Sequence, residues 1–153
     1  MRLKIRRANP NESEILTALA HAAKRHWRYP ENWIEAWKAE LTITQDFIAD
    51  NEVFVAIVEG EIAGCCALVV NTIAELEHMW IDPQLMGNGV GRALFEHATR
   101  RAQALGFRSL ELSADPNAEG FYQHMGALKI GDMPAEVLGH SRLLPRMKVE
   151  LNR

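Results

Sequence analysis

Polar and apolar positions alternate at the start of the chain, in 3-LKIR-6, and a period of two predicts a β-strand with one buried face. From residue 15 to residue 23 the apolar positions recur every three to four residues instead, which is the spacing of an amphipathic helix. Asn11, followed three residues later by Glu14, forms the pattern of a capping box at the start of this helix. The helix is expected to end within 26-HWRYP-30.

The next part of the chain predicts further helical segments and then strands. A helix is expected after Pro30, with apolar side chains at helical spacing at Trp33, Ile34, Trp37 and Leu41. A short turn is expected after it, over 44–50. The apolar runs 53–58 and 62–70 are separated by 59-EGE-61, which predicts a β-hairpin with a short loop. Residues 73–81 are expected to form the strand that follows.

The second half of the chain begins with three glycines in 87-GNGVG-91, directly before a segment with helical spacing. That helix is expected to run to about Leu105 and to stop at Gly106. The elements expected after it are a strand at 108–114, a turn at 115–117, a short helix at 118–125, a loop-rich segment at 131–145, and strands at 127–130 and 146–151.

The order of these elements, β-α-α-β-β-β-α-β-α-β-β, contains no repeat and no linker. It predicts a single mixed α/β domain over residues 1–153, with a mostly antiparallel sheet and helices on both of its faces. The βαβ unit around the glycine segment should be parallel and right-handed, as crossovers between parallel strands almost always are. A chain of 153 residues is long enough to bury roughly 70% of its unfolded surface.

Charge and composition exclude several classes of function. The net charge is −3 and the pI is about 6.1, so no basic field indicates binding to nucleic acid or to an anionic membrane. The longest apolar stretch, 63–70, is far shorter than the roughly 20 residues of a membrane helix. The first ten residues are too polar for a signal peptide.

The cysteines and histidines indicate neither a disulfide nor a metal site. Cys65 and Cys66 are the only cysteines, and neighbours on a strand point to opposite faces, so both are expected to be small buried residues. Free thiols are typical of a reducing compartment, and a cytoplasmic location is expected. The six histidines form no HxxxH pair and join no CxxC motif, so no metal is expected.

The glycine segment predicts a site for a phosphate group. The first N–H groups of a helix have no partner within the helix and carry partial positive charge, and glycine lets a diphosphate approach them. Asn88 and Gly89 are expected to take positive φ and to turn these amides toward the ligand. Both common nucleotide motifs fail on spacing, because no lysine follows the glycines as in a P-loop and Arg92 stands where the dinucleotide motif has its third glycine.

The segment 81-IDPQLMGNGVGRAL-94, with Gln84-x-x-Gly87-x-Gly89 at its centre, resembles the acyl-CoA-binding motif of the GCN5-related N-acetyltransferase (GNAT) family. A second block, 117-NAEGFYQHMG-126, is similar to the downstream Asn, Phe-Tyr and Gly signature of the same family. The order of elements also matches that family over essentially the whole chain. The resemblance implies the family's fold and an enzyme that moves an acetyl group from acetyl-CoA to an amine, by direct attack in a ternary complex.

The resemblance also implies which residues hold coenzyme A. Amides of the glycine loop would hold the pyrophosphate, and the preceding strand would pair with the pantetheine arm as in β-strand addition. For Arg92 the alternative is an ordinary exposed helix arginine, and for Asn117 it is a cap for the short helix that follows. The residues expected at the cofactor are Met79, Trp80, Ile81, Gln84, Met86, Gly87, Asn88, Gly89, Val90, Gly91, Arg92, Asn117, Phe121 and Tyr122.

Tyr122 lies where the family places a general acid near the sulfur, and a phenol with a pKa near 10 stays protonated at pH 7. The alternative for Tyr122 is plain aromatic packing with its neighbour. Glu75 and Glu77 share the expectation of the general base. By a period of two they fall on one face of their strand together with Met79 and Ile81. His78, on the opposite face, is expected to be structural.

Trp27, Tyr29 and His140 are expected to border the acceptor pocket, with anchoring of helices to the core as the alternative for Trp27 and Tyr29. The expected acceptor is a small-molecule or peptide amine, and a homodimer is expected because homodimers are common in the family. The alternative to an enzyme is a non-catalytic module that senses or regulates through bound CoA or acyl-CoA. A tyrosine together with acidic residues on the strand favours catalysis.

Overall fold

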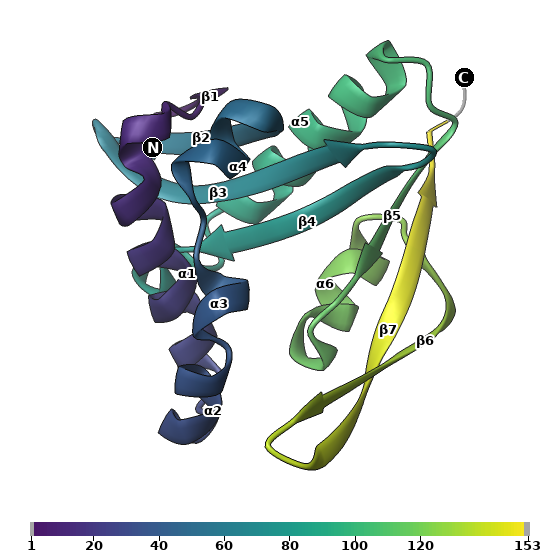
Figure 1. Ribbon diagram of the computed structural model, residues 1–153. Helices are drawn as coiled ribbons and strands as arrows, with labels where there is room; N and C mark the ends of the chain where they lie inside the picture. The colour runs from purple at the N-terminus through teal and green to yellow at the C-terminus, as the bar shows by residue number, and fades with distance from the viewer. Residues whose placement is uncertain (1, 152–153) are drawn as a thin grey trace.

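The computed structural model describes residues 2–151 of the chain. Seven strands form one sheet in the order β1-β2-β3-β4-β5-β7-β6 (Figure 1). All neighbouring strands are antiparallel except β4 and β5, which are parallel. The mixed α/β fold, the mostly antiparallel sheet and the one parallel pair expected from the sequence are confirmed.

The elements follow the expected order along the chain, with 3-10 helices labelled η. The first half contains β1 (Leu3–Arg7), η1 (Pro10–Glu12), α1 (Ser13–His26), α2 (Glu31–Ala36), α3 (Lys38–Leu41), α4 (Gln45–Asp50), β2 (Glu52–Val58), β3 (Glu61–Val70) and β4 (Ala74–Ile81). The second half contains η2 (Pro83–Leu85), α5 (Val90–Ala104), β5 (Ser109–Ser113), η3 (Pro116–Ala118), α6 (Glu119–His124), β6 (Leu128–Val137) and β7 (His140–Glu150). Within the described part of the chain, none of these helices has the length and apolar character to cross a membrane.

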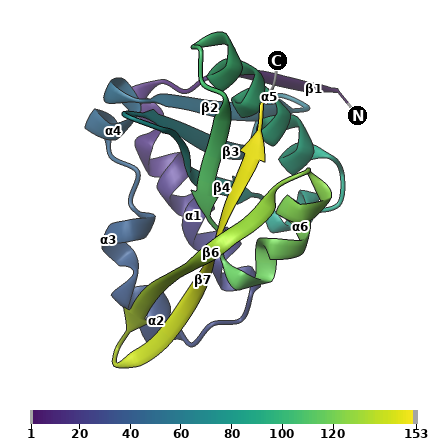
Figure 2. The ribbon, with the colours of Figure 1, turned by 90° about the vertical axis from the view of Figure 1, so that its right-hand side faces the viewer.

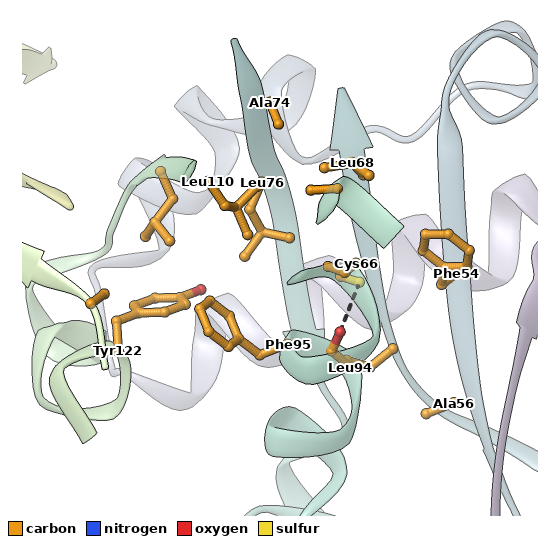
Figure 3. Close-up of a cluster of buried hydrophobic side chains, with 14 of the residues drawn as sticks. Phe54, Ala56, Cys66, Leu68, Ala74, Leu76, Leu94, Phe95, Leu110 and Tyr122 are labelled. Carbon is orange, nitrogen blue, oxygen red and sulfur yellow. Dashed lines mark hydrogen bonds between the residues drawn. The ribbon is translucent and has the colours of Figure 1, made fainter. Parts of the chain in front are cut away.

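The sheet separates two hydrophobic clusters. On one face, β2 and β3 pack against α1 to α4 through a cluster that includes Leu16. On the other face they pack against α5, and Figure 3 shows Leu94 and Phe95 within that cluster. Cys65 belongs to the first cluster and Cys66 to the second, and both are buried free thiols, as expected for neighbours on a strand. Helices therefore cover both faces of the sheet.

Two details of the first helices differ from the sequence prediction. The carboxylate of Glu12 accepts a hydrogen bond of 2.8 Å from the amide of Asn9, so the capping box expected at Asn11 and Glu14 lies two residues earlier, on the 3-10 turn that precedes α1. The single helix expected after the proline is divided into α2 and α3 at Trp37. The chain tightens there, because the amide of this tryptophan bonds to the carbonyls three and four residues back.

The segment expected to be loop-rich, 131–145, is instead part of a long hairpin that extends from the body of the molecule (Figure 2). Leu138 and Gly139 make its turn, both with positive φ, as in two-residue hairpin turns of type I′. Pro134 is tolerated because β6 is an edge strand of the sheet. Only Val137 of β6 is buried, so no alternation of apolar residues marked this strand in the sequence.

A β-bulge in β4 changes which of its side chains share a face. The pairing with β3 shifts by one residue and leaves Glu77 without a partner across the ladder. Leu76, Met79 and Ile81 therefore all pack against the cluster on the α5 side of the sheet. Glu75 is the neighbour of Leu76 and points to the other face. The expectation that Glu75 shares a face with Met79 and Ile81 is wrong, because the bulge shifts the alternation.

Candidate active site

β4 and β5 pair only through Ala74 with Leu110 and Glu75 with Glu111, and beyond this junction the two strands diverge (Figure 1). A cavity of about 490 Å³ lies in the opening between them. Its walls are the diverging halves of both strands, the loop before α5, the start of α5, and α6, with Ala23 of α1 and Trp27 just after it on one side. The glycine segment and the second sequence motif therefore meet at one cavity.

The edge of β4 that faces this opening carries unpaired main-chain groups. The amide of Asp82 donates to the carbonyl of Ala63 on β3 (2.8 Å), and successive residues of a strand direct their main-chain groups to alternate sides. The amides and carbonyls of Met79 and Ile81 therefore point away from β3, into the opening. Met79, Ile81 and the intervening Trp80 all line the cavity. An extended ligand that carries amides can add to this edge as a further strand.

The loop before α5 leaves several amides free. Gly87 and Gly89 both have a φ of 85°, and Gly89 is the residue that caps the helix. The first hydrogen bond of α5 runs from the amide of Ala93 to the carbonyl of Gly89 (3.0 Å). Among the described residues, no group accepts from the three amides before it, those of residues 90–92. Together with the helix dipole, these donors make a site for an anion.

The three glycines of the loop serve two different purposes. At Gly87 and Gly89, no heavy atom of the described chain lies within 4 Å of the position that a Cβ would take, so the loop surface is open to a ligand. A Cβ on Gly91 would lie 3.2 Å from Cζ of Phe121, so this glycine lets α5 pack against α6. The positive φ expected at Asn88 is wrong, because Gly87 takes that conformation instead. Two open glycines beside free amides fit the diphosphate of coenzyme A.

The other residues expected at the cofactor differ in their distance from the cavity. Gln84 and Asn88 are exposed on the outer side of the loop, and Val90 is buried beneath it. Arg92 lies at the rim, with its guanidinium 3.4 Å from the carboxylate of Glu96 one turn later. The expected residues of the loop and of α6 that line the cavity are Met86, Gly87, Gly89, Gly91, Arg92, Phe121 and Tyr122.

Tyr122 lies on α6, with its ring in the hydrophobic cluster of Figure 3, and it lines the cavity. The residue is 6% exposed, and burial raises the pKa of its phenol above the usual value, with smaller contributions from Cys66 and Asp115. The phenol therefore stays protonated at physiological pH and can donate a proton. The rings of Phe95 and Phe121 lie 5.8 Å and 5.0 Å from its centroid and fix its direction.

The two carboxylates expected as general bases have different surroundings. Oε2 of Glu75 lies 2.6 Å from Nη1 of Arg146, so its charge is already paired. Glu77 lines the cavity. Burial raises the pKa of Glu77, the charge of Glu75 raises it further, and the charge of Arg146 lowers it. A carboxylate at a cavity wall with a raised pKa suits a group that accepts a proton.

His78 and Trp80 form a hydrogen-bonded pair that the sequence did not predict. Nε1 of Trp80 donates to Nδ1 of His78 (2.8 Å), and the imidazole packs edge-on against the ring of Phe47. Burial lowers the pKa of His78 to about 4, so the ring is neutral at physiological pH. Because Nδ1 accepts from the indole, the ring proton lies on Nε2. Both side chains line the cavity, where they add an aromatic wall with a neutral polar edge.

The far side of the cavity is built on a partly buried ionic cluster around Asp115, just after β5. Asp115 accepts hydrogen bonds from Lys24 (2.7 Å) and from the hydroxyl of Tyr29 (3.0 Å). That hydroxyl accepts in turn from Arg142 (2.7 Å) and Asn117 (3.1 Å). Burial alone would raise the pKa of Asp115, but the charge of Lys24 and the hydrogen bonds hold it below the usual value. These residues, the Asp115 cluster, tie α1 and the loop after it to β5 and β7.

The cations of the Asp115 cluster also lie over aromatic rings. Nζ of Lys24 is 4.4 Å from the centroid of Trp37, and the guanidinium of Arg142 is 5.0 Å from the centroids of Trp37 and Tyr29. Burial raises the pKa of Tyr29 to about 12, so its hydroxyl keeps the proton that it donates. The sequence marked Asp115 only as a turn residue, because nothing local shows that residues so far apart in the chain converge on it.

The three side chains expected to border the acceptor pocket lie at different depths. Trp27 lines the cavity. Tyr29 lies behind the wall, in the Asp115 cluster. His140 lies at the turn of the β6–β7 hairpin, where its ring centroid is 5.2 Å from that of Trp33. Within residues 2–151, no group of three or more His, Cys, Asp or Glu side chains is arranged to hold a metal ion.

Sequence comparisons decide the family. The family model described as the Acetyltransferase (GNAT) family matches residues 16–127. The chain belongs to the GNAT family of acetyltransferases. This GNAT protein is also 30% identical over 146 residues to the peptidyl-lysine N-acetyltransferase YjaB of Salmonella typhimurium, a match that covers 91% of this chain and 92% of the relative.

Solved structures share the fold of this GNAT protein. A GCN5-related N-acetyltransferase from Rhodopseudomonas palustris is similar with a TM-score of 0.83 at 18% identity, over 98% of this chain and 96% of the other. The PaiA N-acetyltransferase of Thermoplasma acidophilum, in complex with coenzyme A, is similar with a TM-score of 0.78 at 17% identity, over 98% and 99% of the two chains. The resemblance stated from the sequence is confirmed, and the protein is an acetyl-CoA-dependent N-acetyltransferase.

Proposed function

We propose that this GNAT enzyme acetylates the amine of a small molecule or peptide by direct attack in a ternary complex, within the opening between β4 and β5. The observation that carries the proposal is the joint position of Glu77 and Tyr122. They reach one cavity from different walls, β4 and α6, beside the free amides of residues 90–92. A proton acceptor and a proton donor therefore flank the space in which the thioester would lie.

The chain offers complementary groups to each part of coenzyme A. The amides of residues 90–92 would hold the diphosphate, because they are unpaired donors at the positive end of a 15-residue helix. The main chain of Met79 and Ile81 would pair with the amides of the pantetheine arm along the edge of β4. Asn117 and Phe121 would contact that arm from the side of β5 and α6.

Bound acetyl-CoA supplies the thioester carbonyl that the acceptor amine attacks. Glu77 would take the proton that the nitrogen loses as the C–N bond forms, and Tyr122 would give its proton to the sulfur as the C–S bond breaks. An amide on the free edge of β4 would donate to the oxygen on which negative charge develops. Each of these groups is in the required state at pH 7, since the phenol of Tyr122 is protonated and the carboxylate of Glu77 can still be ionised.

Between the two candidate bases, we assign the role to Glu77. Glu75 lies on the face of the strand opposite Leu76 and shares its charge with Arg146 at 2.6 Å. Taking up a proton there would break this ion pair. Glu77 has no such partner among the described residues, and it lines the cavity. It can therefore accept a proton without loss of an existing contact.

The acceptor would enter beside α1 and the His78–Trp80 pair. Trp27 and Trp80 offer flat apolar walls to an aliphatic stem, and Glu77 offers negative charge to an ammonium group before it loses its proton. A lysine side chain has both features, and the relative YjaB is named a peptidyl-lysine N-acetyltransferase. We therefore include lysine side chains among the proposed acceptors, next to small aliphatic amines.

The proposal extends to assembly and location. Exposed apolar side chains occur along the β6–β7 hairpin, where Leu128, Ile130 and Leu143 are 72%, 53% and 61% exposed. Exposed apolar side chains at the edge of the sheet favour a homodimer, which sedimentation of wild-type protein and of a Leu128→Ser, Leu143→Ser variant would test. A cytoplasmic location is proposed because acetyl-CoA is supplied inside the cell.

Calorimetry with coenzyme A and release of free thiol from acetyl-CoA test the proposal. Amines in the panel should include a lysine peptide and small diamines. Glu77→Gln and Tyr122→Phe should each lower kcat by about 10² or more while the Kd for coenzyme A changes little. Glu75→Gln is the matched control and should lose less than tenfold. A larger loss in Glu75→Gln than in Glu77→Gln would reverse the assignment of the base, and the absence of turnover with every amine would remove the proposed acceptor class.

A further inference from the structure

Arg146 spans the junction at which β4 and β5 begin to diverge. It lies on β7, and its guanidinium reaches across β5 to β4. Nη1 is 2.6 Å from Oε2 of Glu75 and 3.0 Å from Oγ of Ser113, and Nη2 is 3.1 Å from Oε1 of Glu111. Glu75 and Glu111 are directly paired across β4 and β5, at the last register position before the opening. One side chain therefore bridges three strands at the start of the cavity.

The charges at this junction are unequal. Arg146, whose side chain is only 15% exposed, pairs with both Glu75 and Glu111, and Glu77 lies two residues from Glu75 on β4. Lys148 lies opposite Glu111 on β7, but its ammonium pairs with Glu150. Like charges two residues apart on β4 repel one another, and partial burial strengthens this effect. The pairing with Arg146 cancels the charge of Glu75 locally, so Glu77 is the carboxylate that is left without a partner.

We propose that Arg146 is a positioning residue that sets the proton affinity of Glu77, because it neutralises Glu75 beside it while it fixes the junction of β4 and β5. The inference rests on the proposed role of Glu77 as the base. It assigns Glu75 an electrostatic role in the same site. The two acidic residues of β4, which the sequence presented as equivalent, then have different functions, and a residue 71 positions away from Glu75 separates them.

The other charged groups around the cavity do not account for the state of Glu77. Burial is the main cause that raises the pKa of Glu77. The charge of Glu75 raises this pKa further, and the charge of Arg146 lowers it. On the neighbouring elements, Asp115 is paired with Lys24 and the imidazole of His78 is neutral. The remaining titratable or charged side chains that face the cavity from α5 and α6 are Arg92, Tyr122 and His124.

A titration of the free protein tests the inference without any turnover. The carboxyl carbon of Glu77 is followed by NMR in protein labelled with ¹³C-glutamate, and Glu77→Gln identifies its signal. Arg146→Met should move the midpoint of the Glu77 titration up by about 0.5 to 1 pH unit, because the charge of Glu75 is then unopposed. Glu75→Gln should move it down by a similar amount. The double variant should return it toward the wild-type midpoint.

Glu111→Gln is the matched control, since it removes the other carboxylate partner of Arg146, and the charge of Glu111 is not among the causes that shift the pKa of Glu77. It should leave the midpoint unchanged. If Arg146→Met does not fold, Glu75→Gln alone still gives a signed result. Equal midpoints in wild type and Glu75→Gln would overturn the inference.

The acidic limb of kcat/KM against pH separates this inference from the proposed function. The limb should move in the same direction as the midpoint in each variant if Glu77 is the base. Midpoints that move while the limb stays fixed would retain the role of Arg146 and would remove Glu77 as the base. A loss of stability alone, without opposite shifts in the two single variants, would show that Arg146 is only structural and would overturn the inference.

Discussion

The two sides of the cavity are built in contrasting ways. On the cofactor side, the loop before α5 is one continuous segment, and its function depends on main-chain amides and on the φ of Gly87 and Gly89. On the other side, the Asp115 cluster joins side chains by hydrogen bonds that span up to 113 residues, and its charged side chains are only 12–14% exposed. A local main-chain site with open surroundings can lose a ligand without loss of the fold. A largely desolvated ionic cluster that connects distant elements cannot lose one charge without a cost to folding.

Removal of the central charge of the Asp115 cluster should have the largest effect. Asp115→Ala leaves the ammonium of Lys24 without its partner in a site where the two side chains are only 12% and 14% exposed. We expect a loss of about 3 to 5 kcal/mol in the free energy of unfolding, measured by urea denaturation at pH 7. Asp115→Asn combined with Lys24→Met removes both charges and should recover part of the loss. A loss below about 1 kcal/mol in Asp115→Ala would show that the cluster does not hold the two halves together.

The imidazole of His78 on β4, across the cavity from the Asp115 cluster, should make stability depend on pH. The pKa of His78 is lowered by burial from 6.5 to about 4, so the unfolded chain binds a proton that the folded chain does not. The contribution of the neutral imidazole to the free energy of unfolding is fully present above pH 6.5 and is lost as the pH falls toward 4. At about 1.4 kcal/mol per pH unit, this loss is about 3 kcal/mol.

Urea denaturation at several values between pH 4 and pH 7 measures this effect against a matched variant. His78→Gln keeps an oxygen that can accept the bond from Trp80 and removes the titrating ring. The slope of stability against pH in this window should therefore be steeper in wild type than in the variant. Parallel slopes would mean that the imidazole of His78 is protonated in the folded protein at the same pH as in the unfolded chain.

The same contrast explains what the sequence could predict. The strands β1 to β5, the helix α5 and the loop before it depend on residues close together in the chain, so periodicity and the glycine motif located them. The bulge at Glu77 depends on the register between β3 and β4, which no pattern within β4 contains. The Asp115 cluster forms only after residues 24, 29, 115 and 142 are brought together by folding.

The β6–β7 hairpin shows a further limit of periodicity. A strand is visible in a sequence when one of its faces is buried, because burial selects apolar residues at alternate positions. β6 is almost wholly exposed, so its residues alternate in no detectable way. The glycines and prolines between residues 131 and 145 predicted loops, although an edge strand tolerates both.

On the cofactor side, a substitution in the loop should reduce affinity rather than stability. Gly89→Ala places a side chain at a φ of 85°, which costs about 1 to 2 kcal/mol. Because no described heavy atom packs over this position, the loop can move to relieve the strain, and the amides then lose their arrangement. The Kd for coenzyme A should rise about tenfold, with little change in the midpoint of urea denaturation.

Gly91→Ala is the matched control for this prediction. Its φ is not positive, and the added Cβ would press on the ring of Phe121 at 3.2 Å. This variant should lose stability while the loop keeps its conformation and most of its affinity. If the two variants behave alike in both measurements, the distinction between open and packed glycines is wrong.

The smallest expected effect concerns Arg92, whose guanidinium is 52% exposed and lies 3.4 Å from the carboxylate of Glu96. An exposed cation at the start of α5 can attract a diphosphate, but water and salt screen it and Glu96 competes for it. Arg92→Gln should raise the Kd for coenzyme A about threefold at about 0.05 M salt, and the difference should nearly vanish at about 0.5 M. Glu96→Gln should have the opposite sign, because it releases the guanidinium. Calorimetry of both variants at the two salt concentrations decides between a phosphate contact and an ordinary helix arginine, since the latter would leave both affinities unchanged at low salt.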